Sequence, residues 1–179
     1  DTHHYGSLLL ATGATPVTLD LRPSERVVYF RTFGDYRRLR ALATEGTHIV
    51  VVGGGYIGTE IAAALAQNKV TVTLVSSDDV VGGHMFPADL ASVFHRDFED
   101  HGVTVRTGVK VDSGAQQGNS VSLNLSDGST LDADAVVFGI GVKPNTDLAE
   151  QAGLDVDNGI VVDEFLRTAD EHVYAAGDV

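Results

Sequence analysis

The sequence contains no cysteine, and it has few basic residues. Without cysteine the chain has neither a disulfide nor a CxxC redox pair, so electrons passing through these residues would need a carrier other than sulfur. The 25 acidic residues outnumber the 12 lysines and arginines and give a net charge of −13 at pH 7. This balance provides no basic surface for a phosphate backbone and therefore predicts no nucleic-acid partner.

Long apolar runs and several catalytic motifs are also missing. No run approaches the length that spans a bilayer, and the first residues, DTHHYGS, lack the pattern of a signal peptide, so we expect no membrane partner and a cytoplasmic location. The seven histidines include no HExxH pair, which predicts no metal site. No tyrosine has lysine four positions on, which argues against a short-chain dehydrogenase, and no GxSxG motif indicates a hydrolase, so we assign no catalytic residue.

The most informative motif lies at residues 48–60, which read HIVVVGGGYIGTE. A β-branched strand is expected to end at Gly53, the backbone to approach a pyrophosphate at Gly55, and a helix to pack closely on the sheet at Gly58. The first N–H groups of that helix, which begins with Tyr56 and Ile57, would point at the phosphates. A tight turn that only packs a strand against a helix is the alternative, but the strand before and the helix after favour a dinucleotide site.

Hydrophobic patterning predicts an α/β fold, and 179 residues fit one domain or one domain with pieces of a second. After the strand before Gly53, the pattern predicts a helix ending near 67–69, a strand at 70–75, a helix through Leu90 and Phe98, and a strand at 103–105. Residues 135–138 are continuously apolar, as expected of a strand buried on both faces.

An antiparallel meander is expected between these parallel strands. Apolar residues alternate with polar ones at Val109 and Val111 and again through Val121, Leu123 and Leu125, and a hairpin turn is expected at 127–128. The remaining segments are shorter. They are strands at 8–11, 27–30, 160–162 and 173–176 and helices at 36–43 and 147–151. The strands nearest the two ends of the chain could pair with one another.

Four motifs resemble the pyridine nucleotide-disulfide oxidoreductases, and they occur in that family's order: LLLATGATP at 8–16, GGGYIGTE at 53–60, FGIGVKPN at 138–145 and VYAAGD at 173–178. Within the family, FRTFGDYRRLR at 30–40 and HMFPADLASVFHRDFEDHGV at 84–103 resemble the branch of ferredoxin reductases, rubredoxin reductases and apoptosis-inducing-factor-like proteins. The resemblance implies a Rossmann-like parallel sheet with crossover helices and an antiparallel β-meander. It implies an NAD(P)H-binding domain at 17–143, flanked by remnants of an FAD-binding domain at 1–16 and 144–179.

In such a family, NADH binds this domain and passes hydride to FAD in the flanking domain, and the flavin then reduces a redox partner such as a ferredoxin. The glycine motif for FAD would lie before residue 1, so we expect the chain to be a fragment, inactive alone, that does not hold FAD tightly. The alternative is a free-standing NAD-binding module that senses NAD or docks a partner without catalysis.

The resemblance also assigns residues near the nicotinamide. It places Tyr56 as an aromatic gate over the nicotinamide pocket, Glu60 near the carboxamide, and Gly139 and Gly141 in a loop beside the ring. Tyr56 could instead pack half-buried on the sheet, Glu60 could be a solvated helix carboxylate, and the two glycines could simply end a strand. Asp178 resembles the acid that holds the flavin ribityl chain in full-length members.

The choice between NADH and NADPH depends on the end of the second parallel strand. NAD-binding proteins usually place an acid there to bond the ribose 2′-hydroxyl, and this chain has Ser76, followed by Ser77, Asp78 and Asp79. A 2′-phosphate needs a basic partner, and no lysine or arginine occurs between 69 and 96. We therefore expect NADH to be preferred, and Ser76→Glu to strengthen NADH binding.

Overall fold

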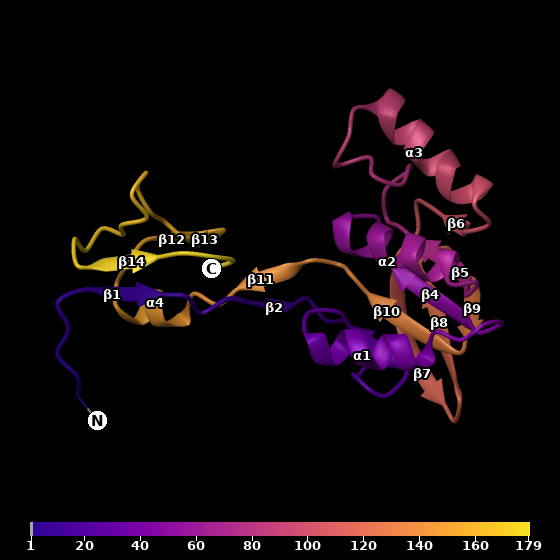
Figure 1. The fold of residues 1–179 in the computed structure, drawn as a ribbon, viewed down its shortest axis with the longest axis horizontal. Coiled ribbons are helices and arrows are strands. Elements are labelled where there is room, and N and C mark those ends of the chain that lie inside the picture. Colours follow the sequence, from indigo (N-terminus) through magenta and orange to yellow (C-terminus); the bar gives the residue numbers. More distant parts are fainter. Residues whose placement is uncertain (1) are drawn as a thin grey trace. The chain divides into compact units, whose positions relative to one another are not determined.

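The computed structural model describes residues 2–179, which form two compact units. Unit 1 comprises the residues up to Thr15 together with Val142–Val179, and unit 2 comprises Pro16–Gly141 (Figure 1). Over residues 2–179, none of the helices combines the length and the apolar character that crossing a bilayer requires.

Unit 2 is built on a five-stranded parallel sheet. Its strand order is β3 (Val27–Tyr29), β10 (Ala135–Phe138), β4 (His48–Val52), β5 (Thr71–Val75) and β6 (Thr104–Arg106). Three helices and an antiparallel meander complete the unit (Figure 1): α1 (Phe33–Leu42), α2 (Tyr56–Gln67), α3 (Ala88–Asp100), β7 (Val111–Gln117), β8 (Ser120–Leu125) and β9 (Thr130–Ala133). The predicted α/β class, with parallel strands, crossover helices and a meander, is confirmed.

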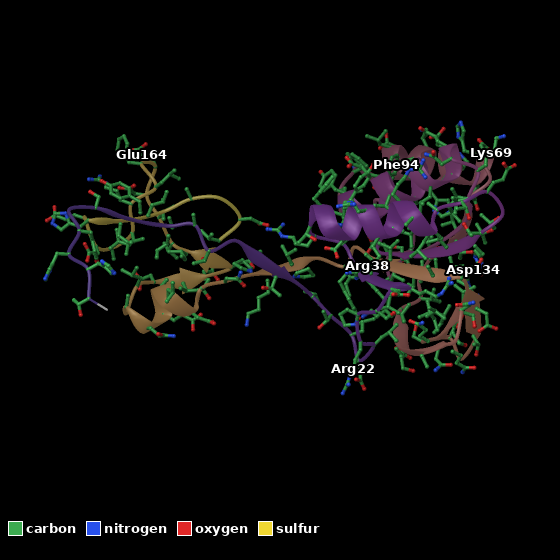
Figure 2. The ribbon with its side chains drawn as sticks, turned by 60° about the horizontal axis from the view of Figure 1, so that its bottom comes forward. Arg22, Arg38, Lys69, Phe94, Asp134 and Glu164 are labelled. Atoms are coloured by element: carbon green, nitrogen blue, oxygen red, sulfur yellow. The ribbon has the colours of Figure 1, made fainter. Side chains whose placement is uncertain are left out.

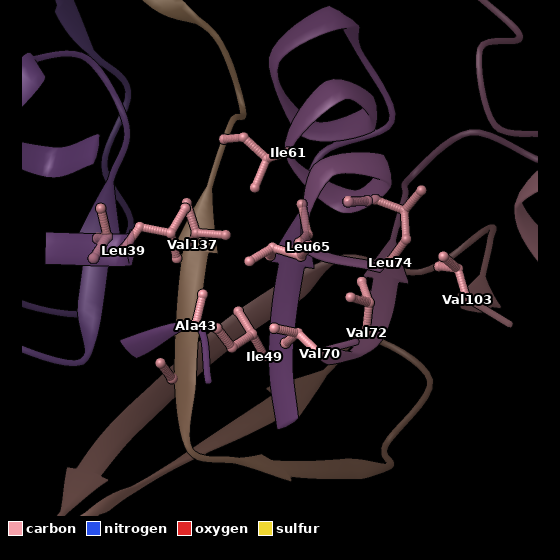
Figure 3. Packing of buried hydrophobic residues seen from close by; sticks show 14 of the residues in the cluster. Leu39, Ala43, Ile49, Ile61, Leu65, Val70, Val72, Leu74, Val103 and Val137 are labelled. Carbon is pink, nitrogen blue, oxygen red and sulfur yellow. The ribbon is translucent and has the colours of Figure 1, made fainter. Parts of the chain in front are cut away.

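The helices cover one face of the sheet and the meander covers the other. Along β4, Ile49 and Val51 pack with the helices, whereas Val50 and Val52 pack with the meander. Figure 3 shows the first of these layers, in which Ile61 and Leu65 of α2 and Val137 of β10 belong to one apolar cluster. Burial on both faces explains why these strands are apolar at every position. By contrast, charged side chains such as those of Arg22 and Lys69 project from the outside of the unit (Figure 2).

Helix α1 begins earlier than its apolar pattern predicts. The sequence pattern placed its start at Tyr36, but the helix begins at Phe33 because Thr32 and Asp35 form a capping box. The Thr32 hydroxyl accepts from the Asp35 N–H at 3.2 Å, and the Asp35 carboxylate accepts from the Thr32 N–H at 2.8 Å. Two otherwise unsatisfied N–H groups are thereby bonded, which stabilises a first turn that contributes no buried residue.

The meander differs from its prediction only at its start. The alternating pattern included Val109, but β7 begins at Val111, and a register irregularity between Val111 and Ser113 follows at once. The predicted turn at 127–128 is present: Gly128 has a φ of +81° and its N–H donates to the Leu125 carbonyl at 2.9 Å.

Unit 1 has a small core of its own. β1 (Leu8–Leu10) pairs in parallel with β14 (Val173–Ala175), so the expected pairing of the two end strands is confirmed. α4 (Asp147–Gln151) has the predicted bounds. The bounds of the strand predicted at 160–162 are wrong: β13 (Gly159–Ile160) begins one residue earlier, ends at Ile160 and pairs antiparallel with β12 (Val156–Asp157) across Asn158. Two further strands, β2 (Ala14–Pro16) and β11 (Val142–Pro144), pair with each other and were not predicted.

Candidate functional site

A cleft of about 380 Å³ opens where three strands of the unit 2 sheet end. From β4 the chain continues to β5 and then β6, which lie on one side of β4 in the sheet. Strand β10, which comes later in the sequence, lies on the other side of β4, so the direction in which strands are added reverses between β4 and β10. Ligands of open α/β sheets bind outside the carboxyl ends of strands at such a reversal. The cleft is lined by Gly53, Gly54, Gly55, Tyr56, Ile57, Ser76, Ser77, Asp78, His84, Gly139, Ile140 and Gly141.

Two of the glycines in the motif at residues 48–60, Gly53 and Gly58, must be glycine because neighbouring backbone atoms leave no room for a side chain. Gly53 has a φ of +124°, and a Cβ there would lie 2.3 Å from the Gly139 carbonyl oxygen. A Cβ on Gly58 would lie 1.9 Å from the Gly53 carbonyl oxygen. The turn after β4 is therefore pressed between the end of β10 and the first turn of α2, as the expected close packing at Gly58 requires.

Gly55 is different, because the protein does not crowd it. A Cβ on Gly55 would meet only the His84 imidazole, with Nε2 at 3.5 Å and Cε1 at 3.8 Å, and Gly55 has an ordinary φ of −86°. Gly55 is also the N-cap of α2, and no side chain caps this helix. The first N–H groups of α2 and the space above Gly55 thus fit an anionic ligand that approaches the backbone closely.

Tyr56 and Ile57 lie at the rim of this cleft. Tyr56 is 66% exposed. The alternative in which this ring packs half-buried on the sheet is therefore wrong. The Ile57 side chain is closer to the sheet, with Cγ2 3.1 Å from the position that a Cβ on Gly139 would take. The aromatic ring of Tyr56 is therefore free to cover a ligand, and Ile57 forms part of the cleft wall.

Glu60, one turn further along α2, lines a different groove. This second groove, of about 460 Å³, lies between α1 and α2 and also contains Tyr36, Leu39, Ile57 and Leu65. Glu60 is exposed there and is not among the residues that line the first cleft, at Gly53, Gly54 and Gly55. Ile57 lines both spaces, so the two adjoin at that residue.

The end of β5 forms the side wall of the cleft. Ser76 is only 2% exposed, and its Oγ accepts from the Asp78 N–H at 3.2 Å. A Cβ on Gly54 would lie 2.3 Å from this Oγ, so a side chain at Gly54 would displace the Ser76 hydroxyl. Ser77 is exposed and Asp78 is half-buried, and both line the cleft.

His84 was not predicted from the sequence, yet it lines the cleft. Its Nδ1 lies 2.5 Å from the Asp78 Oδ2, although the two residues are six positions apart in an irregular loop. No periodic pattern connects such residues, and the only sequence signal is a histidine beside two glycines in a loop that follows a parallel strand. Within residues 2–179, the lining of this cleft includes no lysine or arginine, so its ionisable side chains are those of Asp78, His84 and Tyr56.

The remaining predicted residues lie at the ends of two strands. The Gly139 N–H donates to the Val52 carbonyl at 2.8 Å, which joins the ends of β10 and β4, and Gly141 has a φ of +100° with open space around it. Both glycines line the cleft. Asp178 belongs to unit 1, where it is exposed and follows Gly177 just beyond the carboxyl end of β14.

Comparisons with known proteins are consistent with this geometry. Rhodocoxin reductase of Rhodococcus erythropolis is 40% identical over 178 residues, which are 97% of this chain and 42% of that protein. The covalent putidaredoxin reductase–putidaredoxin complex matches with a TM-score of 0.90 and 35% identity, over 97% of this chain and 44% of that one. The water-forming NADH oxidase from Lactobacillus brevis, in a structure bound to NADH, has a TM-score of 0.90 and 30% identity, over 99% of this chain and 40% of that one.

This chain therefore spans less than half the length of these relatives. The family model described as pyridine nucleotide-disulphide oxidoreductase matches residues 1–179. The resemblance drawn from the four sequence motifs is thereby confirmed, and the chain belongs to the pyridine nucleotide-disulphide oxidoreductase family.

Proposed function

We propose that the cleft binds NADH through its diphosphate and that the chain serves as the nicotinamide-nucleotide-binding part of a flavoprotein reductase. The observation that carries this proposal is the difference between the three glycines. Gly53 and Gly58 are glycine because the protein crowds them, whereas Gly55 has room for a side chain that the sequence does not use. A ligand backbone passing over Gly55 explains that residue, and the uncapped N–H groups of α2 supply the donors for its phosphates.

The charge of the cleft wall supports NADH rather than NADPH. Asp78 lines the cleft, and Asp79 lines an adjoining space that also contains Ser77 and His84. Two carboxylates would repel a 2′-phosphate, and the part of the chain that the structure describes places neither lysine nor arginine on the wall to bind one. The Ser77 hydroxyl and the Asp78 carboxylate would instead bond the ribose hydroxyl groups.

The opposite end of the cleft is suited to the nicotinamide. Tyr56 would cover the ring, while Gly139 and Gly141 leave its other side open. NADH supplies a hydride when it is bound, and the residues of unit 2 bind and orient it. In the whole reductase we propose that this hydride goes to FAD, that Asp178 contributes to the FAD site, and that the flavin reduces a ferredoxin-like protein. The names rhodocoxin reductase and putidaredoxin reductase among the relatives support this choice of partner.

Isothermal titration of the purified chain with NADH, NADPH and ADP-ribose tests the proposal. We expect saturable binding of NADH and ADP-ribose, and weaker binding of NADPH by about tenfold, since one unfavourable charge contact is worth roughly 1 kcal/mol or more near a protein surface. If none of the three ligands bound, the cleft would not be a dinucleotide site. Tighter binding of NADPH than of NADH would overturn the stated preference.

A further inference from the structure

We propose that His84, held in place by Asp78, is an anion subsite for the diphosphate of the bound dinucleotide. This inference rests on the proposed function of the cleft. It adds to the diphosphate site a residue that lies outside the motif at residues 48–60. His84 lies in the loop between β5 and α3, on the wall that faces the start of α2.

The position of the ring carries the proposal. The imidazole Nδ1 lies 2.5 Å from the Asp78 Oδ2, and the other nitrogen, Nε2, lies 3.5 Å from where a Cβ on Gly55 would be. The same Asp78 oxygen is 3.9 Å from where a Cβ on Gly54 would be. One edge of the ring is therefore bound to a carboxylate and the other edge stands over the glycine turn that a diphosphate must cross.

Asp78 is itself held by the backbone. Its N–H donates to the Ser76 Oγ at 3.2 Å, and its carbonyl accepts from the Gly108 N–H at 2.8 Å. An aspartate fixed in this way accepts the Nδ1–H of His84, so the orientation of the ring is set before any ligand arrives. Nε2 is left to donate to a phosphate oxygen when the ring carries its second proton.

The charge of the cleft makes this donor important. A dinucleotide diphosphate is anionic, and the chain carries a net charge of −13. Among residues 2–179, the cleft lining holds His84 as its one side chain able to become a cation. Apart from the N–H groups of α2, His84 is therefore the group best placed to balance the charge of the diphosphate, while Asp78 opposes an additional phosphate on the ribose.

A purely structural role would be to hold the loop, and the loop has other bonds for that purpose. The Phe86 N–H donates to the Gly82 carbonyl at 3.0 Å, and the Val81 N–H donates to the His95 Nδ1 at 3.3 Å. The His84 side chain is 59% exposed. We therefore expect His84→Ala to keep the thermal stability of the chain. His101 provides a matched control, because it is an exposed histidine 3.4 Å from an aspartate, Asp97, and lies outside the cleft.

The test is titration calorimetry of the chain and its variants with ADP, NADH and NADPH. We expect His84→Ala to weaken ADP and NADH binding by about tenfold, the equivalent of one hydrogen bond to a charged group, and His101→Ala to change neither. His84→Arg, which keeps a cation within reach of Gly55, should restore ADP binding to within about threefold of the original. Asp78→Asn should narrow the preference for NADH over NADPH.

Two results would overturn the inference, and a third would refute the proposed function. If the unaltered chain bound NADH and His84→Ala bound ADP and NADH equally well, the subsite would be refuted and the proposed function would stand. If His84→Ala lost thermal stability and His84→Arg failed to restore ADP binding, the pair would be a structural bond, which also overturns the inference. Failure of the unaltered chain to bind ADP and NADH would refute the proposed function itself.

Discussion

Replacing Gly58 and Gly55 separately with alanine should change two different properties. Gly58→Ala should lower the stability of the fold, and Gly55→Ala should weaken ligand binding. In Gly58→Ala the new Cβ would stand 1.9 Å from the Gly53 carbonyl oxygen, whereas ordinary contacts begin near 3.4 Å. The start of α2 must therefore move away from β4 by roughly 1.5 Å, and overpacking of this kind costs about 1–3 kcal/mol. Alanine recovers about 0.5–1 kcal/mol through its better helix propensity. We expect a net loss of about 1 kcal/mol in the free energy of unfolding, within a range of about 0–2.5 kcal/mol set by these two effects.

Gly55→Ala should behave in the opposite way. Its φ of −86° suits alanine, and its nearest neighbour, the His84 Nε2, would be at ordinary contact distance. Alanine is a poorer N-cap than glycine by several tenths of a kcal/mol, and the lower entropy of its unfolded chain offsets about as much. Stability should thus change by less than about 0.5 kcal/mol, while NADH binding falls by about tenfold to a hundredfold because the methyl group enters the ligand's space.

Urea unfolding and NADH calorimetry on both variants check this pair of predictions. Gly58→Ala should unfold at lower urea, with an unchanged dependence on urea concentration, and Gly55→Ala should unfold as the original chain does. Equal NADH affinity in Gly55→Ala and the original chain would refute the close approach of a ligand at Gly55. Equal stability in Gly58→Ala would refute the packing argument at Gly58.

Three further changes test individual contacts. Tyr56→Ala should weaken NADH binding about fivefold and leave ADP-ribose binding unchanged, because an exposed ring worth about 1 kcal/mol would cover only the nicotinamide; equal losses for both ligands in calorimetry would contradict this. Ser77→Glu should strengthen NADH binding relative to NADPH in competition titrations, because Ser77 is exposed on the cleft wall, unlike the buried Ser76, and a carboxylate there bonds ribose hydroxyl groups and repels a 2′-phosphate. Burial alone would raise the pKa of Asp35, but hydrogen bonds from Thr32 and Arg31 lower it. Its contribution to stability is therefore present above the unfolded pKa of about 3.9 and lost as pH falls through the lower folded pKa, so unfolding of Asp35→Asn and the original chain should converge in acid and differ at neutral pH.

The parts of the fold that sequence patterns predicted well are those whose burial is two-sided or periodic. Residues 135–138 form β10 within its predicted bounds because every side chain there is buried. Helix α2 (Tyr56–Gln67), whose buried residues recur at helical spacing, likewise ends within the predicted range of 67–69. Gly58 was predictable because its constraint is local: a Cβ there would meet the Gly53 carbonyl oxygen, five positions away. Gly53 is crowded by Gly139, which is far away in the sequence, so the motif located this glycine but not its contact.

Other features depend on partners far away in the sequence. β2 and β11 are three residues each, too short for a period to show, and they form because segments separated by more than a hundred residues pair. Glu60 and His84 illustrate the same limit at the site. The helical pattern places Glu60 on α2 but does not reveal which of two adjoining grooves it lines, and the pairing of His84 with Asp78 depends on how an irregular loop folds.

The central claim is that the cleft at Gly53, Gly55 and Gly58 binds the diphosphate of NADH, and a crystal structure of the chain grown with NADH tests it most directly. We predict density for the diphosphate over Gly55, within hydrogen-bond distance of the first N–H groups of α2, and the adenosine ribose beside Ser77 and Asp78. A nucleotide bound elsewhere, for example in the groove between α1 and α2, would contradict the claim. So would crystals in which saturating NADH leaves the cleft without a ligand.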